Sequence, residues 1–365
     1  MSVLPAAAGL DQLPGAFAPR LIAWQRQHGR HGLPWQHTRD PYRVWLSEVM
    51  LQQTQVSTVL TYFDRFLHRF PDVQSLADAP ADAVMSLWAG LGYYSRARNL
   101  HRCAQVVVKD HGGVFPSTAA QLQNLPGIGA STAAAIAAFC HGERVSIVDG
   151  NVRRVLARLL AFDQDLAQVA SQRELWALAQ GLLPQSPTPA DMSAYTQGLM
   201  DLGATVCRRS QPLCERCPVQ SLCQARASGA VTQFPVKSSR VKRRSESWWL
   251  LMLQSPSPAQ GGMDFWLERR PAPGIWAGLF CPPVLRSEAE LQQRVPAQAW
   301  QAAQHLPAVA HSLTHRELRL HPVVVCVDRS LVADFLAPGE WVTPDELATL
   351  GLPAPVRSLY QQLAS

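Results

Sequence analysis

The sequence predicts a mainly helical body followed by a smaller C-terminal α+β domain. Apolar residues recur with helical periodicity over residues 15–223, where short joints rich in Gly and Pro separate the helices and alternating strand patterns are absent. After Cys223 the chain becomes polar, and beyond residue 246 strand-like segments alternate with helical patches. The length of 365 residues is enough for two or three domains with sizeable cores.

The composition is that of a globular protein, because 47% of the residues are apolar and only 16% are charged. No uninterrupted apolar run reaches the ~18 residues of a membrane span, which argues against a membrane protein. Residues 1–20 lack the pattern of a secretory signal, so we expect a cytoplasmic protein with reduced cysteines. The net charge of +6 is compatible with a nucleic-acid partner but does not establish one.

We expect four segments along the chain, without internal repeats. These are an N-terminal extension with the first helix at residues 1–29, a helical domain at 30–223, a basic linker at 224–246 and the α+β domain at 247–365. The linker carries five cations between Lys237 and Arg244. Such a run is typical of a solvated linker, and contact with phosphates is the alternative.

Capping residues and periodicity place the individual elements. Asp40 suits an N-cap and Pro41 a first helical position, and the apolar residues after them are Tyr42, Trp45, Val49 and Val56. Further helices are predicted at Asp82–Gly90, Ala119–Leu125, Ser131–Cys140 and Val152–Leu160. In the C-terminal domain, strands are predicted at Ser247–Gln254, Phe265–Arg269, Leu318–Val327 and Glu340–Val342, with helices at Glu288–Arg294 and Thr343–Leu350.

Four of the eight cysteines lie in one short loop with the spacing C-x6-C-x2-C-x5-C, namely Cys207, Cys214, Cys217 and Cys223. Four thiolates in one loop form a soft donor set for an iron–sulfur cluster or for zinc. The spacing favours a [4Fe–4S] cluster, because structural zinc sites usually pair two C-x2-C knuckles and only one is present. Zinc and unliganded thiols remain the alternatives.

A second motif, Leu125-Pro-Gly-Ile-Gly129, joins two predicted helices. Gly127 and Gly129 allow a tight turn and a close approach of the backbone to a partner, which suits phosphate binding without regard to sequence. Turns that contain glycine are common between helices, so this motif alone is weak evidence.

Taken together, the motifs resemble a known family. LPGIG, VDGNVRRVLAR (Val148–Arg158) and the four-cysteine spacing are similar to the helix–hairpin–helix DNA glycosylases of the endonuclease III superfamily. Within that superfamily, EVMLQQTQV (Glu48–Val56) and GLGYYSRARNLH (Gly90–His101) resemble MutY-type adenine DNA glycosylases. The resemblance implies a helix–hairpin–helix glycosylase body with an iron–sulfur cluster loop, followed by a Nudix-like domain.

Removal of a base requires an acid that protonates the leaving purine and an anion that stabilises the cationic sugar. Carboxyl groups can fill both roles. Glu48 lies in an otherwise apolar helix, where desolvation would raise its pKa, although it could instead be a surface glutamate. Asp149 lies in a turn and could simply cap the next helix. The resemblance implies that Glu48 protonates adenine N7, that Asp149 stabilises the sugar intermediate and that Asn151 supports this geometry.

Ser131 decides the subclass within the superfamily. By resemblance, the bifunctional relatives carry here a lysine that forms a Schiff base with the sugar, and Ser131 has no amine. We therefore expect a monofunctional glycosylase without a robust lyase step.

The resemblance also implies contacts with the DNA. Leu51 and Gln53 would fill the base stack beside the extruded adenine, and Tyr93 would wedge beside the opposite lesion, although Tyr93 could also be a core aromatic. Two positions depart from the family pattern. Gln36 stands where some relatives carry a basic residue, and Gln197 where others carry a glutamate.

In the C-terminal domain, Trp276–Pro283 resembles a Nudix-like domain that recognises 8-oxoguanine. Glu288 and Glu290 do not have the spacing of a Nudix magnesium site, which argues against pyrophosphohydrolase activity. The segment Leu313, Thr314 and His315 matches the family's F-S-H lesion loop with two substitutions. Thr314 keeps the hydroxyl, whereas Leu313 lacks the aromatic ring.

We therefore expect a monomeric enzyme of base-excision repair that removes adenine mispaired with 8-oxoguanine, or less efficiently with guanine, in duplex DNA. It would carry a [4Fe–4S] cluster and, in a bacterium, associate with the nucleoid. One alternative is an endonuclease III-like glycosylase/lyase. The other is a catalytically silent protein that only binds the lesion.

Overall fold

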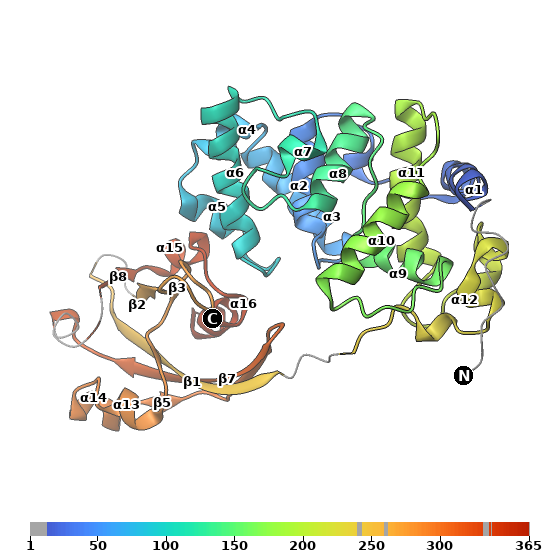
Figure 1. The fold of residues 1–365 in the computed structure, drawn as a ribbon. Coiled ribbons are helices and arrows are strands. Elements are labelled where there is room, and N and C mark those ends of the chain that lie inside the picture. Colours follow the sequence, from blue (N-terminus) through green and yellow to red (C-terminus); the bar gives the residue numbers. More distant parts are fainter. Residues whose placement is uncertain (1–12, 239–242, 259–261, 331–335, 337, 365) are drawn as a thin grey trace. The chain divides into compact units, whose positions relative to one another are not determined.

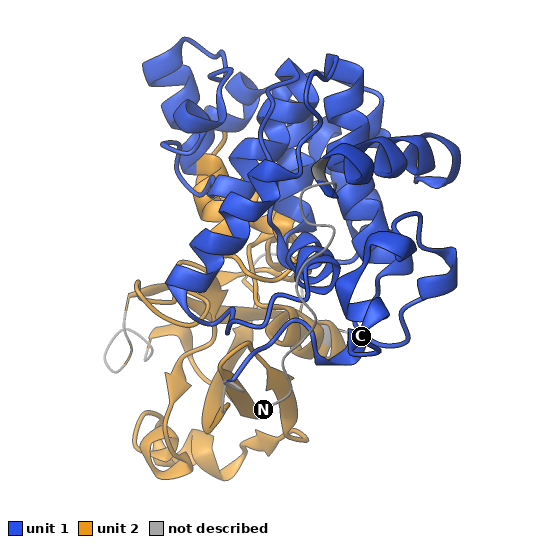
Figure 2. Ribbon diagram, turned by 45° about the vertical axis from the view of Figure 1, so that its right-hand side comes forward, with its two compact units in different colours: residues 1–77, 102–240 blue, residues 78–101, 241–365 orange. Residues whose placement is uncertain are grey.

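The structure, a computed structural model, describes residues 13–238, 243–258, 262–330, 336 and 338–364 (Figure 1). The first twelve residues of the expected N-terminal extension and residues 239–242 of the basic run lie outside this range. The described chain falls into two compact units, residues 1–77 with 102–240 and residues 78–101 with 241–365 (Figure 2).

The first unit is helical. Its helices are α1 (Leu13–His28), α2 (Pro41–Leu51), α3 (Val56–Arg69), α4 (Val73–Ala77), α7 (Ala119–Leu122), α8 (Ala130–Ile136), α9 (Gly150–Leu159), α10 (Val169–Gly181), α11 (Pro189–Asp201) and α12 (Gln224–Ala227). The boundary between the units falls within α6 (Ser95–His111). A core of apolar side chains from α1, α8, α9, α10 and α11 holds the unit together, and α1 packs against α11 (Figure 1).

The predicted start of α2 is confirmed, because Pro41 is its first residue and the Asp40 side chain accepts a hydrogen bond from the Tyr42 backbone N–H at 3.0 Å. The apolar pattern through Val56 is divided between two helices. α2 ends at Leu51, and α3 begins at Val56 after a short connection. This connection brings residues 52–55 to the wall of a cleft in the first unit.

The second unit is a mixed sheet with short helices. Its strands are β1 (Arg244–Pro256), β2 (Met263–Arg269), β3 (Phe280–Cys281), β4 (Val284–Leu285), β5 (Gln304–His305), β6 (Val309–Ser312), β7 (Arg316–Cys326) and β8 (Gly339–Val342). Its helices are α5 (Ala81–Trp88), α13 (Glu288–Gln292), α14 (Ala297–Gln301), α15 (Pro344–Thr349) and α16 (Ala354–Ala364). The predicted strands and helices of this region are confirmed.

The centre of the sheet is the long parallel pair of β1 and β7, which pair from Arg244 with Arg316 to Gln254 with Cys326 (Figure 1). The strand order is β3-β2-β1-β7-β5, with β4, β6 and β8 paired at the sides of this path. Consecutive residues of β1 between Leu250 and Leu253 are all buried, as expected for a strand that is covered on both faces.

Residues 78–101 pack with the C-terminal part of the chain although they are far away in sequence. The Tyr94 hydroxyl donates to the Leu352 carbonyl at 3.0 Å, and Arg98 donates to the Ala277 carbonyl at 2.6 Å. An exposed ion pair joins Arg269 to Asp82. These contacts attach the Gly92–Tyr93 loop to the second unit.

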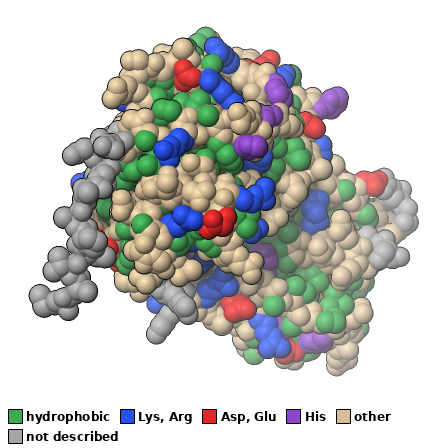
Figure 3. Space-filling model, turned by 90° about the vertical axis from the view of Figure 1, so that its right-hand side faces the viewer, with side chains coloured by type: hydrophobic (Ala, Val, Ile, Leu, Met, Phe, Trp, Pro, Cys, Tyr) green, Lys and Arg blue, Asp and Glu red, His purple; other side chains and the backbone are tan. Residues whose placement is uncertain are grey.

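Within the described residues, no helix combines the length and apolar character that crossing a membrane requires. On the face shown in Figure 3, the described Lys and Arg side chains are scattered among hydrophobic and neutral ones rather than gathered into one patch.

Candidate functional site

The first unit contains a cleft of about 1320 Å³. It is formed by α2 and the connection after it, the start of α8, the turn before α9, and α11. The predicted site residues that line it are Glu48, Leu51, Gln53, Ser131, Asp149, Asn151 and Gln197. The fold thus brings together residues that are up to 149 positions apart in the sequence, from Glu48 to Gln197.

Glu48 projects into this cleft from α2 and is partly buried. Its neighbours Ser47 and Val49 belong to the buried interior. Burial raises the pKa of Glu48 to about 8, and the negative charge of Asp149 contributes to this rise. The side chain is therefore predominantly a neutral acid at pH 7, as the apolar sequence around it suggests.

Asp149 is the N-cap of α9, because its Oδ1 accepts a hydrogen bond from the Val152 backbone N–H at 2.7 Å. The capping role considered from the sequence is therefore present, and the same side chain also lines the cleft. Ser131 supports this turn, since its Oγ accepts from the Val148 backbone N–H at 3.2 Å. The hydroxyl thus fixes the backbone that leads into Asp149.

Asn151 is tied to the cysteine loop through Arg154, a residue that sequence reasoning missed. The Arg154 guanidinium donates to Asn151 Oδ1 at 2.9 Å, to the Gly203 carbonyl at 2.7 Å and to the Cys207 carbonyl at 2.8 Å. Gly203 permits this approach, because a Cβ there would lie 2.8 Å from the Cβ of Asn151. The only signal for Arg154 was its position one turn after Asn151.

Two of the four cysteines of the loop contact Arg158, near the end of α9. Arg158 approaches Cys207 Sγ at 3.4 Å, and Cys223 Sγ donates to the Arg158 carbonyl at 3.3 Å. Burial raises the pKa of the Cys217 thiol to about 12, and the other three cysteines act in the same direction. The four sulfurs are thus close enough to influence one another, although within the described ranges no three His, Cys, Asp or Glu side chains form a closed site for a single metal ion.

The predicted hairpin between α7 and α8 is present. Gly127 adopts a left-handed φ of 75°, which favours glycine, and the Ile128 N–H closes the turn on the Leu125 carbonyl at 3.2 Å. A Cβ on Gly129 would meet nothing within 4 Å. The backbone of the hairpin is therefore open to a partner.

The lesion loop predicted from the sequence is the turn between β6 and β7 in the second unit. The Leu313 N–H closes this turn on the Arg316 carbonyl at 2.8 Å. At its tip, the Thr314 hydroxyl donates to the Tyr93 hydroxyl at 3.4 Å, while the neighbouring His315 is exposed. The sequence predicts separately that Tyr93 and Thr314 contact the lesion, and in the structure these two residues contact each other.

Tyr93 and Tyr94 have opposite environments. Tyr93 is 44% exposed and has a left-handed φ of 48°, whereas Tyr94 is buried. The Arg96 guanidinium lies 5.3 Å from the Trp88 ring and 5.4 Å from the Tyr93 ring, and it donates to the Leu91 carbonyl at 3.1 Å. Arg96 therefore supports the strained loop that presents Tyr93.

The two glutamates considered for a Nudix magnesium site have other contacts. Glu290 accepts a hydrogen bond from the Arg286 backbone N–H at 2.8 Å at the start of α13, and Glu288 lies 3.8 Å from His305. The first contact is that of a residue in the first turn of a helix.

Comparison with known proteins gives two family matches. Residues 46–180 match the HhH-GPD superfamily of base excision DNA repair proteins, and residues 259–362 match the NUDIX domain. The first match contains the hairpin, Glu48 and Asp149, and the second contains the lesion loop.

Among solved structures, the chain is similar to a thermostable thymine-DNA glycosylase, with a TM-score of 0.52 and 26% identity over 60% of this chain and 99% of that one. A non-covalent endonuclease III–DNA complex shares the fold, with a TM-score of 0.50 and 19% identity over 60% of this chain and 97% of that one.

Curated relatives cover almost the whole chain. An adenine DNA glycosylase of Buchnera aphidicola subsp. Baizongia pistaciae is 32% identical, over 95% of this chain and 96% of that protein. The adenine DNA glycosylase of Homo sapiens is 35% identical, over 95% of this chain and 73% of that protein. The helix–hairpin–helix body, the Nudix domain and this similarity agree, and the chain belongs to the adenine DNA glycosylase family.

Proposed function

We propose that this protein is a monofunctional DNA glycosylase that hydrolyses the N-glycosidic bond of adenine mispaired with 8-oxoguanine, or with guanine, in duplex DNA. The observation that carries the proposal is the pair of Glu48 and Asp149 in one cleft, where Glu48 has a pKa of about 8. The two carboxyl groups differ in environment, as a general acid and an anionic partner require.

Adenine is a poor leaving group until a ring nitrogen is protonated. Glu48 is mostly protonated at neutral pH and lines the cleft, so it donates its proton to N7 of the extruded adenine. Its carboxylate then accepts a proton from the attacking water. The partly buried position leaves the acid accessible to the base.

Asp149 provides the negative charge beside C1′ as the sugar becomes cationic. The cap on α9 holds this carboxylate in place, and Ser131 fixes the preceding backbone. Asn151, held by Arg154, supports the same turn. Glu48 and Asp149 thus act on opposite parts of the bond that breaks, the leaving base and the sugar.

The absence of a suitable amine supports a monofunctional reaction. Of the described residues that line the cleft, none is a lysine, and Ser131 occupies the position after the hairpin. A lyase step through a Schiff base requires an amine nucleophile close to C1′. We therefore propose that hydrolysis leaves an intact strand with an abasic site.

The remaining site residues are proposed to hold the DNA. Leu51 and Gln53 fill the gap left by the flipped adenine, and Gln53 has the left-handed φ of 59° that exposes it at a turn. Gly127 and Gly129 bring the hairpin backbone to phosphates. In the second unit, Tyr93, Leu313, Thr314 and His315 contact the lesion, with Thr314 and Tyr93 already joined.

Residues 30–223 would thus perform the chemistry, and residues 247–365 together with Tyr93 would recognise the lesion; residues 224–246 connect the two segments. A single chain supplies every group named, so no second copy is required. In a bacterium, such an enzyme would work on chromosomal DNA in the cytoplasm.

The four cysteines fit a [4Fe–4S] cluster by the chemistry of their donors, because all four are unpaired thiols, three of them act electrostatically on Cys217, and two of them contact Arg158. Cys207, Cys214, Cys217 and Cys223 would hold it. When bound, the cluster would fix the loop that carries Arg208, Arg209 and Arg216. It would also hold in place the Cys207 backbone carbonyl, which accepts a hydrogen bond from Arg154.

We expect anaerobically purified protein to contain about four iron and four sulfide per chain. Cys217→Ser should lower the iron content, whereas Cys326→Ser, in the second unit, should not change it. Iron and sulfide analysis by mass spectrometry and colorimetry makes the measurement. Zinc in place of iron would contradict the cofactor assignment.

The proposed function is tested by the products formed from 5′-labelled duplexes with adenine opposite 8-oxoguanine, guanine or thymine. We expect strand breaks only after hot alkali, fastest opposite 8-oxoguanine. Breaks without alkali would support the endonuclease III-like lyase instead. Tight binding of the lesion duplex without release of base would support a protein that only recognises the lesion.

A further inference from the structure

A network of polar contacts lies at the stem of the lesion loop, which consists of residues 313–315 between β6 and β7. The carboxylate of Glu246 is at the centre of this network. The sequence assigned Glu246 to the linker, but in the structure it belongs to β1, which begins at Arg244. The role inferred for Glu246 rests on the proposed function, since it concerns the recognition of 8-oxoguanine by this loop.

Both oxygens of the Glu246 carboxylate bind other side chains. Its Oε1 forms an ion pair with the guanidinium of Arg316, the residue that follows the lesion loop and begins β7. Its Oε2 accepts hydrogen bonds from Trp248 Nε1 at 3.2 Å and from the Arg286 guanidinium at 3.3 Å. Only 22% of the Glu246 side chain is exposed, so these contacts are screened less by water than contacts on an open surface.

Arg316 also determines the shape of the loop through its backbone. Its carbonyl accepts a hydrogen bond from the Leu313 N–H at 2.8 Å, which closes the turn. The next carbonyl toward the tip, that of His315, accepts from the Arg244 N–H at 3.1 Å. Since Arg244 and Glu246 both lie on β1, this backbone contact and the ion pair attach the same end of the loop to one strand.

The other arm of the loop, β6, leads to the same network. Trp248 is 2% exposed, and its ring packs edge-on against Trp276 with 5.5 Å between the ring centroids. The Trp276 ring in turn lies 5.8 Å from the ring of His311 on β6. Because Trp248 donates to Glu246, the side chains that support the two arms are joined through this one carboxylate.

We propose that Glu246 is a positioning residue for recognition of the lesion, because it fixes the stem of the loop that presents Thr314 and His315 to 8-oxoguanine. Glu246 does not touch the DNA itself. One of its oxygens acts through Arg316, and the other binds the Trp248 side chain behind the second arm. A hydrogen bond weakens steeply when its angle or length changes, so contacts with the altered edge of one base require a stem that does not shift.

The loop of this chain depends strongly on such support. Leu313 offers no ring that could stack on a base, so the contacts left for the lesion are the polar ones of Thr314 and His315. Polar contacts depend strictly on direction. The Thr314 hydroxyl also donates to the Tyr93 hydroxyl at 3.4 Å, a long hydrogen bond that a displaced loop would lose. A loosened stem is therefore expected to reduce the discrimination between 8-oxoguanine and guanine.

Glu246→Gln tests this role, because it removes the charge that binds Arg316 and nearly preserves the volume of the side chain. The quantity measured is the dissociation constant of duplexes that carry 2′-fluoro-2′-deoxyadenosine opposite 8-oxoguanine or opposite guanine. The fluorine destabilises a cationic sugar, so the base stays attached while binding is followed by fluorescence anisotropy. The selectivity is the dissociation constant opposite guanine divided by that opposite 8-oxoguanine.

We expect Glu246→Gln to lower this selectivity about fivefold, through weaker binding opposite 8-oxoguanine. Arg316→Gln should lower it by a similar factor, and the double variant by no more than either single substitution, because both break the same contact. Glu288→Gln is the matched control. It makes the same change of charge on an exposed glutamate of the second unit, 3.8 Å from His305, and should leave the selectivity unchanged.

An equal loss of affinity for both duplexes in Glu246→Gln would show that Glu246 is merely structural and would overturn the inference. Additive losses of selectivity from Glu246→Gln and Arg316→Gln would overturn the action through Arg316. Thermal unfolding shows whether each variant is folded, and Arg316→Gln carries the test if Glu246→Gln is not. A wild-type protein that does not prefer 8-oxoguanine is a separate result, since it would contradict the proposed function itself.

Discussion

Glu48→Gln is expected to lower the single-turnover rate of adenine excision by about 10²–10⁴-fold and to leave binding of the mispaired duplex intact. Glutamine has the shape of the neutral acid but has no acidic proton to transfer to N7, and it cannot accept a proton from the attacking water afterwards. Excision is measured with labelled duplexes, and binding by fluorescence anisotropy on the same DNA. A variant that retains wild-type excision would remove Glu48 from the reaction.

The same substitution should stabilise the protein at high pH. Glu48 has a pKa of about 8 in the folded chain against an ordinary value of 4.5, so the folded state holds a proton that the unfolded state has lost between these values. The wild type therefore loses stability relative to Glu48→Gln as the pH rises from 4.5 to 8. The full shift sets a limit of about 5 kcal/mol, and screening by water in the cleft reduces the expected gain to about 2 kcal/mol.

This gain corresponds to a rise in Tm of roughly 5 °C at pH 8, and the difference should nearly vanish at pH 5. Scanning calorimetry at the two pH values makes the comparison. A Tm difference that is independent of pH would contradict the raised pKa. For a buried catalytic acid, we expect the substitution that abolishes excision to increase the stability of the fold.

Asp149→Asn is expected to reduce excision by about 10²–10³-fold without unfolding the protein. Asparagine is as good an N-cap as aspartate, so the bond from the Val152 N–H to the capping oxygen should persist. The negative charge beside the sugar is lost. This substitution therefore separates the two roles that the structure gives to Asp149, capping α9 and lining the cleft.

Asp149→Ala serves as the comparison, because it removes both the charge and the cap and should in addition lower stability by about 1 kcal/mol. Urea unfolding and single-turnover excision are measured on both variants. Equal excision by Asp149→Asn and the wild type would restrict Asp149 to capping. Without the charge of Asp149, the pKa of Glu48 should also fall, since that charge helps to raise it.

Local signals predicted much of the fold. The Asp40-Pro41 start of α2, the hairpin before α8 and the four principal strands were visible because capping, turn chemistry and short strand-like apolar segments are signals that act over a few positions. The local sequence also placed Glu48 on a helix and Asp149 in the turn before the next helix, and the structure brings both to one cleft.

Long-range partners could not be predicted in the same way. Nothing in residues 78–101 indicated that they pack with the C-terminal part of the chain, because the contacts of Tyr94 with Leu352 and of Arg98 with Ala277 join residues that are far apart in the sequence. Arg154 and Asp201 were missed for a related reason. Each looks like an ordinary charged helical residue, and its importance arises only from partners on other elements.

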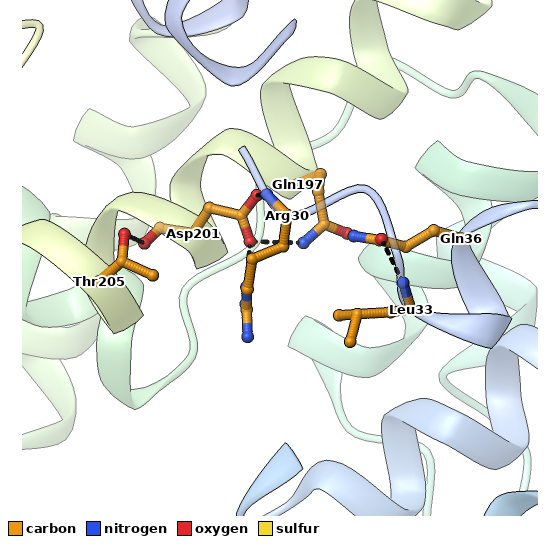
Figure 4. Close-up of polar contacts among 6 residues, drawn as sticks. All are labelled: Arg30, Leu33, Gln36, Gln197, Asp201 and Thr205. Atoms are coloured by element: carbon orange, nitrogen blue, oxygen red, sulfur yellow. Dashed lines mark hydrogen bonds and ion pairs between the residues drawn. The ribbon is translucent and has the colours of Figure 1, made fainter. Parts of the chain in front are cut away.

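Neighbouring residues of the same type also limited what could be predicted from the sequence. Tyr93 and Tyr94 cannot be distinguished by composition, and only the left-handed backbone at Tyr93 turns its ring outward while Tyr94 is buried. Similarly, the sequence left the contacts of Gln36 and Gln197 uncertain. The hydrogen bonds with Leu33 and Asp201 determine how each amide is oriented (Figure 4).

The central claim, that burial holds Glu48 as a neutral acid at physiological pH, is tested most directly by the pH dependence of single-turnover adenine excision. The rate constant should be nearly constant from about pH 6.5 to about pH 7.5, and then fall tenfold per pH unit above the Glu48 pKa of about 8. The residual rate of Glu48→Gln should show no such fall. A wild-type rate that stays level or rises through about pH 9 would contradict the claim.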